Sequence, residues 1–219
     1  MEKDYLVEFN KDIKPLIITF GGIGGGIQGP LFEFKKFLSK NIDCHKIFIR
    51  DTNQSWYHKG VIGFGKNINE LKNNIKEIIN KINYSMIITI GGSMGGYAAL
   101  LFGSLLPVNG IIAFGPQTFI DKDNRKKYKD NRWKSKLKKL YNNNNDDTYY
   151  DLSKLSFQNI NVQIIYGYDH DLDKIHAERM KNKNVIVTGE CCGHAVVKNL
   201  RNNGMLFKII NDMIIDLRK

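Results

Sequence analysis

Residues 87–106 read IITIGGSMGGYAALLFGSLL, and this stretch decides the fold. An isoleucine-rich run ends at four glycines that surround one serine, and a run rich in alanine and leucine follows directly. β-Branched residues favour strands, whereas alanine and leucine favour helices. The order therefore predicts a strand, a sharp glycine-lined turn with Ser93 at its apex, and a helix.

The turn carries the pattern G-x-S-x-G, with Gly91 two residues before Ser93 and Gly95 two residues after it. In a nucleophile elbow, small residues at these positions let strand and helix approach each other, and the serine adopts a strained backbone conformation. The helix N-terminus adds partial positive charge where an oxyanion would form. Ser93 is the candidate nucleophile; the alternative is a glycine-rich turn whose serine only caps the helix.

Short apolar runs alternate with helical patterns along the rest of the chain. This alternation predicts an α/β fold, with a mainly parallel sheet flanked by helices on both faces. Most of the apolar runs are continuous, as expected for strands that are buried on both faces. The predicted strands are residues 6–9, 16–20, 46–50, 86–90, 110–114, 162–166 and 185–187. The predicted helices are residues 31–38, 68–82, 95–106, 174–181 and 205–217, with a further helical pattern at 133–141.

The length of 219 residues, with 42% hydrophobic and 25% charged residues, predicts one globular domain over residues 1–219. Residues 115–160 are polar and basic, and we predict that they form a small cap-like insertion over the sheet. Residues 121–140 hold ten lysines and arginines against three aspartates, which is +7 of the formal net charge of +11. This basic stretch either lies beside the active site and attracts anionic substrates, or is a solvated helical face; it does not indicate a specific nucleic-acid partner.

His194 is the candidate general base. A serine hydroxyl needs a base to take its proton, and that base needs a carboxylate to orient it. His194 lies in CCGHAVV, residues 191–197, after a predicted strand and before further helix, where a loop can present its imidazole beside the elbow. The alternative is an ordinary loop histidine.

Three aspartates compete for the role of the acid. In this arrangement the acid lies between the serine and the histidine along the chain, and residues 167–173 read GYDHDLD after a predicted strand. Asp169 comes soonest after the strand and is the predicted acid. Asp173 looks like the N-cap residue of the next helix, and Asp171 is the third candidate. Both remain open as alternatives for the acid.

Two N–H groups must bind the oxyanion of the tetrahedral intermediate. One is predicted to be the backbone N–H of Met94, the residue after the nucleophile. The loop FGGIGGG, residues 20–26, follows a predicted strand and is analogous to the HGGG-type loop. Its donor would be Gly22 or Ile23, and Gly22 is the prediction.

The same loop also allows a dinucleotide-binding interpretation. Gly24, Gly26 and Gly29 spell G-x-G-x-x-G, and Asp51 ends the next predicted strand, where a ribose ligand would lie. A dinucleotide turn starts directly at the strand end, however, whereas Gly24 comes several residues later and Pro30 follows the last glycine. This interpretation also leaves GGSMGG without a role, so no cofactor is expected.

The cysteines Cys44, Cys191 and Cys192 are predicted to be reduced thiols. The adjacent pair lacks the usual spacing of zinc ligands, so no metal is expected. The sequence also lacks the apolar run of about 20 residues that spans a bilayer, and no secretory signal is recognised, so the expected location is the cytoplasm. Trp56, Tyr57 and His58 fall in a predicted loop, where they either contact substrate or anchor the loop.

The motifs IGGSMGGYAALLFG, YGYDHDLD and the GH of CCGH together resemble the α/β-hydrolase superfamily, and the resemblance spans most of the chain. With RDTNQSWYHKG, DKIHAERM and CCGHAVVKNL, the sequence is also similar to small hydrolases associated with bacterial surface polysaccharides. The resemblance implies an α/β-hydrolase fold and esterase or acyl-transfer chemistry on an acylated sugar.

The sequence therefore predicts a serine hydrolase that cleaves an ester through Ser93, His194, Asp169 and an acyl-enzyme. The expected partner is a small-molecule or glycan ester. An acyltransferase with the same triad and a non-catalytic binding protein on the same fold remain open.

Overall fold

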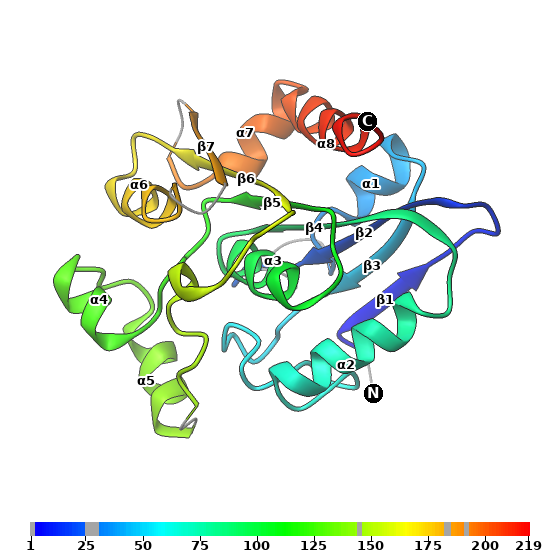
Figure 1. The fold of residues 1–219 in the computed structure, drawn as a ribbon. Coiled ribbons are helices and arrows are strands. Elements are labelled where there is room, and N and C mark those ends of the chain that lie inside the picture. The colour runs from blue at the N-terminus through cyan, green and yellow to red at the C-terminus, as the bar shows by residue number, and fades with distance from the viewer. Residues whose placement is uncertain (1–2, 25–30, 144–145, 182–184, 191–192) are drawn as a thin grey trace.

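The structure is a computed structural model that describes residues 3–24, 31–143, 146–181, 185–190 and 193–219. Its centre is a seven-stranded sheet with the strand order β1-β3-β2-β4-β5-β6-β7 (Figure 1). β1 pairs with β3 in the antiparallel direction, and the remaining pairs are parallel. The strands are β1 (Tyr5–Glu8), β2 (Lys14–Phe20), β3 (His45–Ile49), β4 (Tyr84–Gly92), β5 (Gly110–Phe114), β6 (Asn161–Gly167) and β7 (Val185–Glu190).

Each of the seven strands overlaps one of the predicted ranges, and the predicted fold class is confirmed. The continuous apolar runs mark the central strands, because these are covered on both faces: every residue of β5 is buried, and β2 is buried from its second residue onward. Within these strands, alternate residues belong to two separate apolar clusters, one on each face of the sheet.

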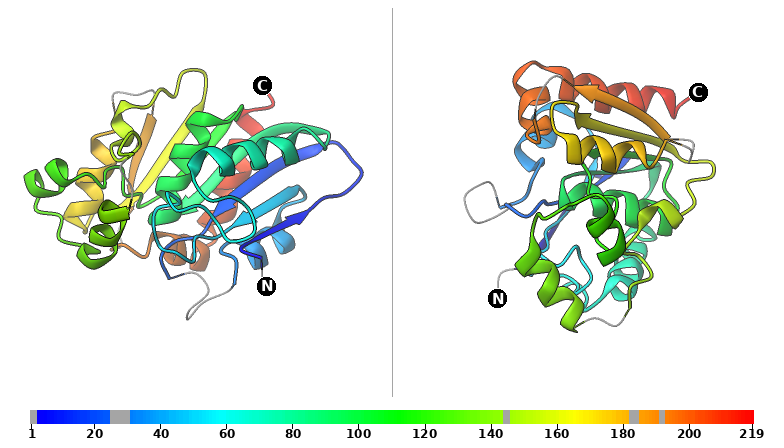
Figure 2. Two further views of the ribbon diagram at one scale, coloured as in Figure 1. Left: turned by 90° about the horizontal axis from the view of Figure 1, so that it is seen from below. Right: turned by 90° about the vertical axis from the view of Figure 1, so that its left-hand side faces the viewer.

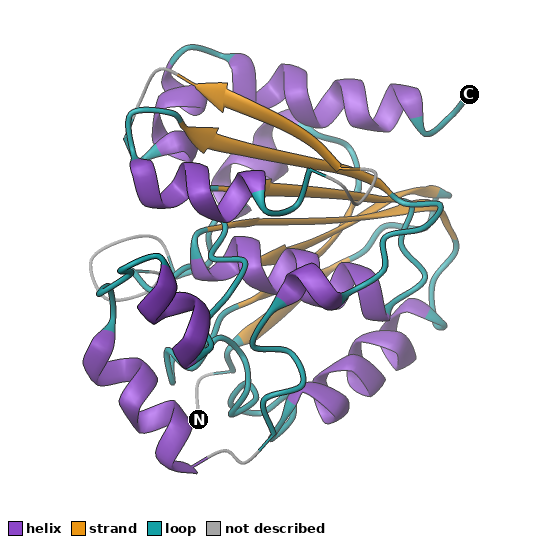
Figure 3. Cartoon of the chain, turned by 60° about the vertical axis from the view of Figure 1, so that its left-hand side comes forward, coloured by secondary structure: helices purple, strands orange, loops and turns teal. Residues whose placement is uncertain are grey.

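Helices cover both faces, as Figures 2 and 3 show. One face packs against α1, α7 and α8, and the other against α2, α3 and α6. The helices that flank the sheet are α1 (Lys35–Asn41), α2 (Ile68–Ile79), α3 (Met94–Leu105), α6 (Asp171–Glu178), α7 (Val196–Asn202) and α8 (Met205–Asp216). One correction matters for the site: α6 begins at Asp171 and not at residue 174. The helical segment expected after His194 is α7.

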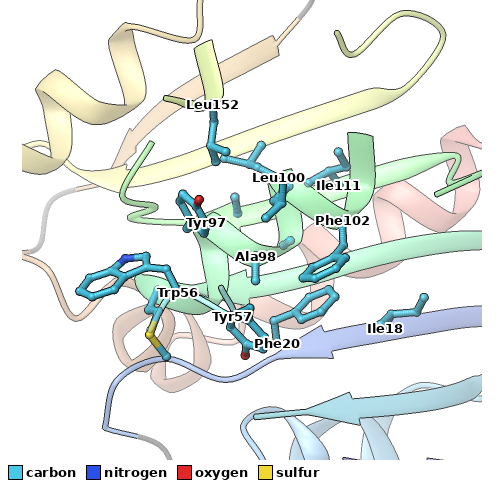
Figure 4. Close-up of a cluster of buried hydrophobic side chains, with 14 of the residues drawn as sticks. Ile18, Phe20, Trp56, Tyr57, Tyr97, Ala98, Leu100, Phe102, Ile111 and Leu152 are labelled. Atoms are coloured by element: carbon cyan, nitrogen blue, oxygen red, sulfur yellow. The ribbon is translucent and has the colours of Figure 1, made fainter. Parts of the chain in front are cut away.

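The helix after the elbow, α3, is buried along almost its whole length. Figure 4 shows its side chains packed against β2, where the rings of Phe20 and Phe102 stack with their centroids 5.2 Å apart. A helix enclosed on this many sides holds its N-terminus in a fixed place. That N-terminus carries Ser93.

Between β5 and β6 the chain makes an excursion, residues 115–160, that contains α4 (Lys122–Lys127), α5 (Lys134–Asn143) and the short 3-10 helix η1 (Leu152–Lys154). Leu137 and Leu140 of α5 and Leu152 of η1 are buried in the same apolar cluster as α3. The excursion is therefore packed onto the body of the protein. In the described ranges, no helix is both long enough and apolar enough to cross a membrane.

Candidate active site

Ser93 lies at the turn between β4 and α3, where the motif predicts it. Its φ of 53° and ψ of −117° form a backbone conformation that non-glycine residues rarely adopt and that is found at functional sites. The flanking glycines make this turn possible. A Cβ on Gly91 would lie 2.0 Å from the carbonyl oxygen of Gly95, and a Cβ on Gly95 would lie 2.1 Å from that of Phe20.

Ser93, His194 and Asp173 form a continuous chain of hydrogen bonds. His194 Nε2 is 3.0 Å from Ser93 Oγ, and His194 Nδ1 is 2.6 Å from Asp173 Oδ2. An ionised carboxylate only accepts hydrogen bonds, so His194 Nδ1 carries a proton and donates a hydrogen bond to Asp173. In the neutral imidazole, Nε2 is then the acceptor for the serine hydroxyl. This arrangement can activate a serine as a nucleophile.

The structure places the carboxylate of Asp173, not that of Asp169, against His194. Asp169 is exposed in the turn after β6, and Asp171 is exposed at the start of α6. The prediction differs from the structure because α6 starts earlier than expected: His170 is the N-cap residue, and its Nδ1 accepts from the backbone N–H of Asp173 at 3.2 Å. Asp173 therefore lies inside the first helical turn and not at its cap.

A helical pattern in the sequence could have identified Asp173. It shares one face of α6 with His176 and Ala177, three and four residues later, and all three are fully buried. An aspartate on the apolar face of a helix needs partners inside the protein. The sequence prediction weighed distance from the strand and overlooked this pattern.

Charged neighbours hold Asp173 in its ionised form. Burial raises the pKa of Asp173, but the hydrogen bond from His194 and the charge of Arg132 outweigh this effect and keep the pKa below its ordinary value. Arg132 Nη1 donates to Asp173 Oδ1 at 2.9 Å, so both carboxylate oxygens have partners. An ionised carboxylate is the form that orients the imidazole of a base and stabilises its imidazolium.

The two predicted oxyanion donors are the backbone N–H groups of Gly22 and Met94, and that of Gly22 already has a hydrogen-bond partner. Its N–H donates to Glu33 Oε2 at 2.7 Å. Burial raises the pKa of Glu33, and the hydrogen bond from Gly22 partly opposes this effect. Ile23, the alternative from the same loop, lines the same cavity as Ser93. The N–H groups that remain candidates are those of Met94 and Ile23.

A cavity of about 460 Å³ opens beside Ser93 and His194. The apolar side chains that line it include Phe34, Phe37, Phe114, Val197 and Leu206. Among the described residues that line it, the basic ones are Lys198 and Arg201 of α7, whereas the basic stretch 122–139 contributes Trp133. The cavity thus combines apolar walls with two cations and the carboxyl group of Glu33, which also lines it.

The loop with Trp56 and Tyr57 is an anchor and does not line this cavity. Both side chains are fully buried. Trp56 Nε1 donates to Gln117 Oε1 at 2.7 Å, and the Tyr57 hydroxyl donates to the carbonyl oxygen of Gly21 at 2.9 Å. His58 is also buried, and its Nε2 lies 2.8 Å from the hydroxyl of Tyr97. Of the two roles left open by the sequence, these contacts favour the anchor.

Asp51, which a dinucleotide site would use for the ribose, instead holds this anchoring loop. Its Oδ2 accepts from the backbone N–H groups of Ser55 and Tyr57 at 2.7 and 2.8 Å. Gly26 and Gly29 of the possible dinucleotide motif lie outside the described residues, as do Cys191 and Cys192. Cys44 is a buried free thiol.

Sequence reasoning missed four charged residues of the site: Glu33, Arg132 and the two cavity-lining residues Lys198 and Arg201. Arg132 could not be distinguished among the ten basic residues of its stretch, because its partner Asp173 is 41 positions away. Glu33 left a weak signal: it stands between Phe32 and Phe34, and a carboxylate inside an apolar run is often a buried one with a partner.

No protein-family model and no curated protein sequence matches the chain. Solved structures do match. The capsule O-acetyltransferase of Neisseria meningitidis serogroup A is similar with a TM-score of 0.67 and 21% identity, over 93% of this chain and 90% of that chain. MenH from S. aureus is similar with a TM-score of 0.63 and 14% identity over 100% of both chains.

A third match is FphF, a fluorophosphonate-binding serine hydrolase of Staphylococcus aureus, with a TM-score of 0.60 and 13% identity over 94% of this chain and 86% of that chain. At these identities the likeness is one of fold. The sheet order, the elbow and these neighbours agree, and the chain has the α/β-hydrolase fold.

Proposed function

We propose that this protein is a serine hydrolase that cleaves an ester, with Ser93 as nucleophile, His194 as general base and Asp173 as the acid that orients the base. One observation carries the proposal. Hydrogen-bond contacts of 2.6 and 3.0 Å link a buried carboxylate through an imidazole to a serine in an elbow conformation. Each residue alone has ordinary structural explanations, but their combination in this order matches the requirements of nucleophilic catalysis.

In the proposed reaction, His194 Nε2 takes the proton of Ser93 as Oγ attacks the ester carbonyl. The backbone N–H groups of Met94 and Ile23 donate to the oxyanion that forms. His194 then gives its proton to the departing alkoxide, which leaves an acyl group on Ser93. Water attacks this acyl-enzyme with His194 again as base, and the acid is released.

The cavity suggests what the ester contains. Its aromatic and aliphatic walls suit an acyl group, because apolar surface favours apolar ligand atoms. Lys198 and Arg201 suit a negative charge elsewhere on the substrate. We therefore propose a small-molecule or glycan ester that carries an anionic group.

The test is turnover of short-chain aryl esters by the wild type and by Ser93→Ala. The variant removes the attacking oxygen and leaves the backbone of the elbow in place, so we expect a folded protein that no longer turns over the ester. Circular dichroism and thermal unfolding check the fold. Equal rates for the two proteins would refute the proposal.

A second candidate is O-acyl transfer to a sugar or another alcohol, favoured by the similarity in fold to a capsule O-acetyltransferase. The same residues would form the acyl-enzyme, and a hydroxyl would replace water in the second half of the reaction. Adding a sugar to the aryl-ester assay separates the two functions. A hydrolase releases the free acid regardless of the sugar, whereas a transferase accumulates the acylated sugar and releases the aryl alcohol faster.

The third possibility, a non-catalytic binding protein on this fold, leads to different expected results. It would leave Ser93 unlabelled by a fluorophosphonate and show no turnover in either assay.

A further inference from the structure

The acid of the proposed triad is held by an arginine from the excursion. Arg132 lies in the segment between α4 and α5, and its Nη1 donates to Asp173 Oδ1 at 2.9 Å. The other edge of its guanidinium faces Asp130: Nε and Nη2 donate to Asp130 Oδ1 and Oδ2 at 3.1 and 2.9 Å. One arginine therefore bridges two carboxylates, both almost fully buried.

His176 forms a hydrogen bond with Asp130 and helps to hold its carboxylate in place. The backbone N–H of Thr118 donates to His176 Nδ1 at 3.0 Å, so the proton of the neutral ring is on Nε2, which lies 3.0 Å from Asp130 Oδ2 and donates to it. Burial lowers the pKa of His176 to about 4, which keeps the ring neutral at neutral pH. Burial raises the pKa of Asp130, but its bonds to His176 and Arg132 hold it well below its usual range.

These contacts join into one chain. It runs from Thr118 through His176, Asp130 and Arg132 to Asp173, and from there through His194 to Ser93. Thr118, Asp130 and Arg132 all belong to the excursion. Long-range hydrogen bonds thus connect the excursion to the candidate nucleophile.

We propose that Arg132 is a positioning residue for the catalytic acid, and that the excursion is a working part of the active site through this arginine. The inference rests on the proposed function. Arg132 fixes the rotamer of Asp173 so that Oδ2 stays directed at His194 Nδ1.

The chemistry of the guanidinium supports this role. Its donors lie in one rigid plane, so the edge held by Asp130 determines where Nη1 points. A lysine would place one compact charge between the two aspartates and could not fix both directions. The backbone also closes around this carboxylate, because a Cβ on Gly115 would lie 3.2 Å from Asp173 Oδ2.

The excursion also reaches the cavity through the next residue, Trp133, which lines it. Trp133 has a φ of 57°, a left-handed conformation that turns the chain sharply after Arg132. Adjacent residues thus face the acid and the substrate cavity. Displacement of this segment would disturb both.

The test compares Arg132→Met with Lys138→Met, in an aryl-ester assay that includes Ser93→Ala. Lys138 is an exposed residue of α5, so its substitution removes the same charge from the same excursion away from Asp173. We expect Arg132→Met to lower kcat roughly tenfold to hundredfold, by analogy with partners that orient metal ligands, while KM for a neutral ester changes little. Lys138→Met should match the wild type.

The pH profile separates positioning from a purely structural role. The charged or titratable groups that face Asp173 are His194 from the loop before α7, His170 from the start of α6, and Arg132 from the excursion. Without the cation of Arg132, Asp173 stabilises the protonated form of His194 more strongly. The acid limb of kcat/KM should therefore move to higher pH in Arg132→Met, and less so in Arg132→Lys.

If Arg132→Met is too unstable to assay, Asp130→Asn serves as the second variant, because it weakens the hold on Arg132 and keeps the shape of the side chain. We expect kcat to fall as in Arg132→Met, whereas the acid limb should move to lower pH, because this variant keeps the cation of Arg132 and removes the negative charge of Asp130. Loss of thermal stability with an unchanged kcat and pH profile in these variants would overturn the inference. If Ser93→Ala retains the wild-type rate, the proposed function itself fails, so the two failures are distinguishable.

Discussion

The elbow at Ser93 and the turn that leads into α6 each supply one member of the proposed triad, but they are built differently. In the elbow, close backbone approaches force the geometry: a Cβ on Gly91 would lie 2.0 Å from the carbonyl oxygen of Gly95, and a Cβ on Gly95 would lie 2.1 Å from that of Phe20. In the α6 turn, contacts from distant segments determine which aspartate is used, because Arg132 and His194 both hydrogen-bond to Asp173.

The difference teaches which parts of a site a sequence can reveal. Glycine is required where atoms collide, so the elbow has a readable pattern. An aspartate is required by a partner, and the partners of Asp173 come from the excursion and from the loop before α7.

Substitution of Gly91 by alanine should break the elbow. The added Cβ would lie 2.0 Å from the carbonyl oxygen of Gly95, and rigid backbone cannot yield to it. We expect a loss of about 3 kcal/mol or more in the free energy of unfolding, measured by urea denaturation, together with loss of activity. Gly193→Ala is the matched control, because no described atom lies within 4 Å of its added Cβ. Equal stability of the two variants would show that the elbow is less constrained than its contacts indicate.

In the turn that leads into α6, the rate of ester turnover should depend on Asp173 and not on Asp169. Asp173→Asn removes the charge that orients His194, and we expect kcat to fall about 10⁴-fold, as in other serine triads, with the fold retained. Asp169→Asn changes an exposed turn residue and should keep a rate close to that of the wild type. A large loss of rate in Asp169→Asn, with a nearly unchanged rate in Asp173→Asn, would identify Asp169 as the acid.

The glycine-rich loop after β2 tests a third part of the site. Glu33 accepts from the Gly22 N–H, and we expect this bond to hold the loop so that the N–H of Ile23 can serve the oxyanion. Glu33→Leu should lower kcat by up to about tenfold, because a hydrogen bond contributes about 0.5–1.5 kcal/mol and about 1.4 kcal/mol corresponds to a tenfold change in rate. Glu33→Gln keeps an acceptor oxygen and should lie close to the wild type. A faster Glu33→Leu enzyme would instead mean that Glu33 blocks Gly22 as a donor.

The last prediction concerns His58, which is buried in the anchoring loop. Burial lowers its pKa from 6.5 to about 4, so below pH 6.5 the unfolded chain takes up a proton that the folded chain refuses. Stability from this residue is therefore present above 6.5 and is lost as the pH falls toward 4, by at most about 1.4 kcal/mol per pH unit. His58→Gln should flatten the dependence of unfolding free energy on pH in this window. An unchanged slope would contradict this account of His58.

The sequence was sufficient for the strands, the fold class and the elbow, because these depend on local periodicity and on glycines at fixed spacing. It was insufficient for the start of α6, which it placed at residue 174, and hence for the choice among three aspartates. It also gave no indication that Glu33 would occupy the Gly22 N–H, since these residues are 11 positions apart and meet only in the folded chain. Contacts that form only in the folded chain leave no periodic pattern and no motif in the sequence.

The central claim is that His194 and Asp173 activate Ser93 as a nucleophile. Its most direct test is reaction of the intact protein with a fluorophosphonate, followed by mass spectrometry of the peptides. The account predicts a single adduct on Ser93 in the wild type, with much slower labelling in His194→Ala and Asp173→Asn. An adduct on another residue, no adduct at all, or equal labelling rates in the three proteins would contradict it.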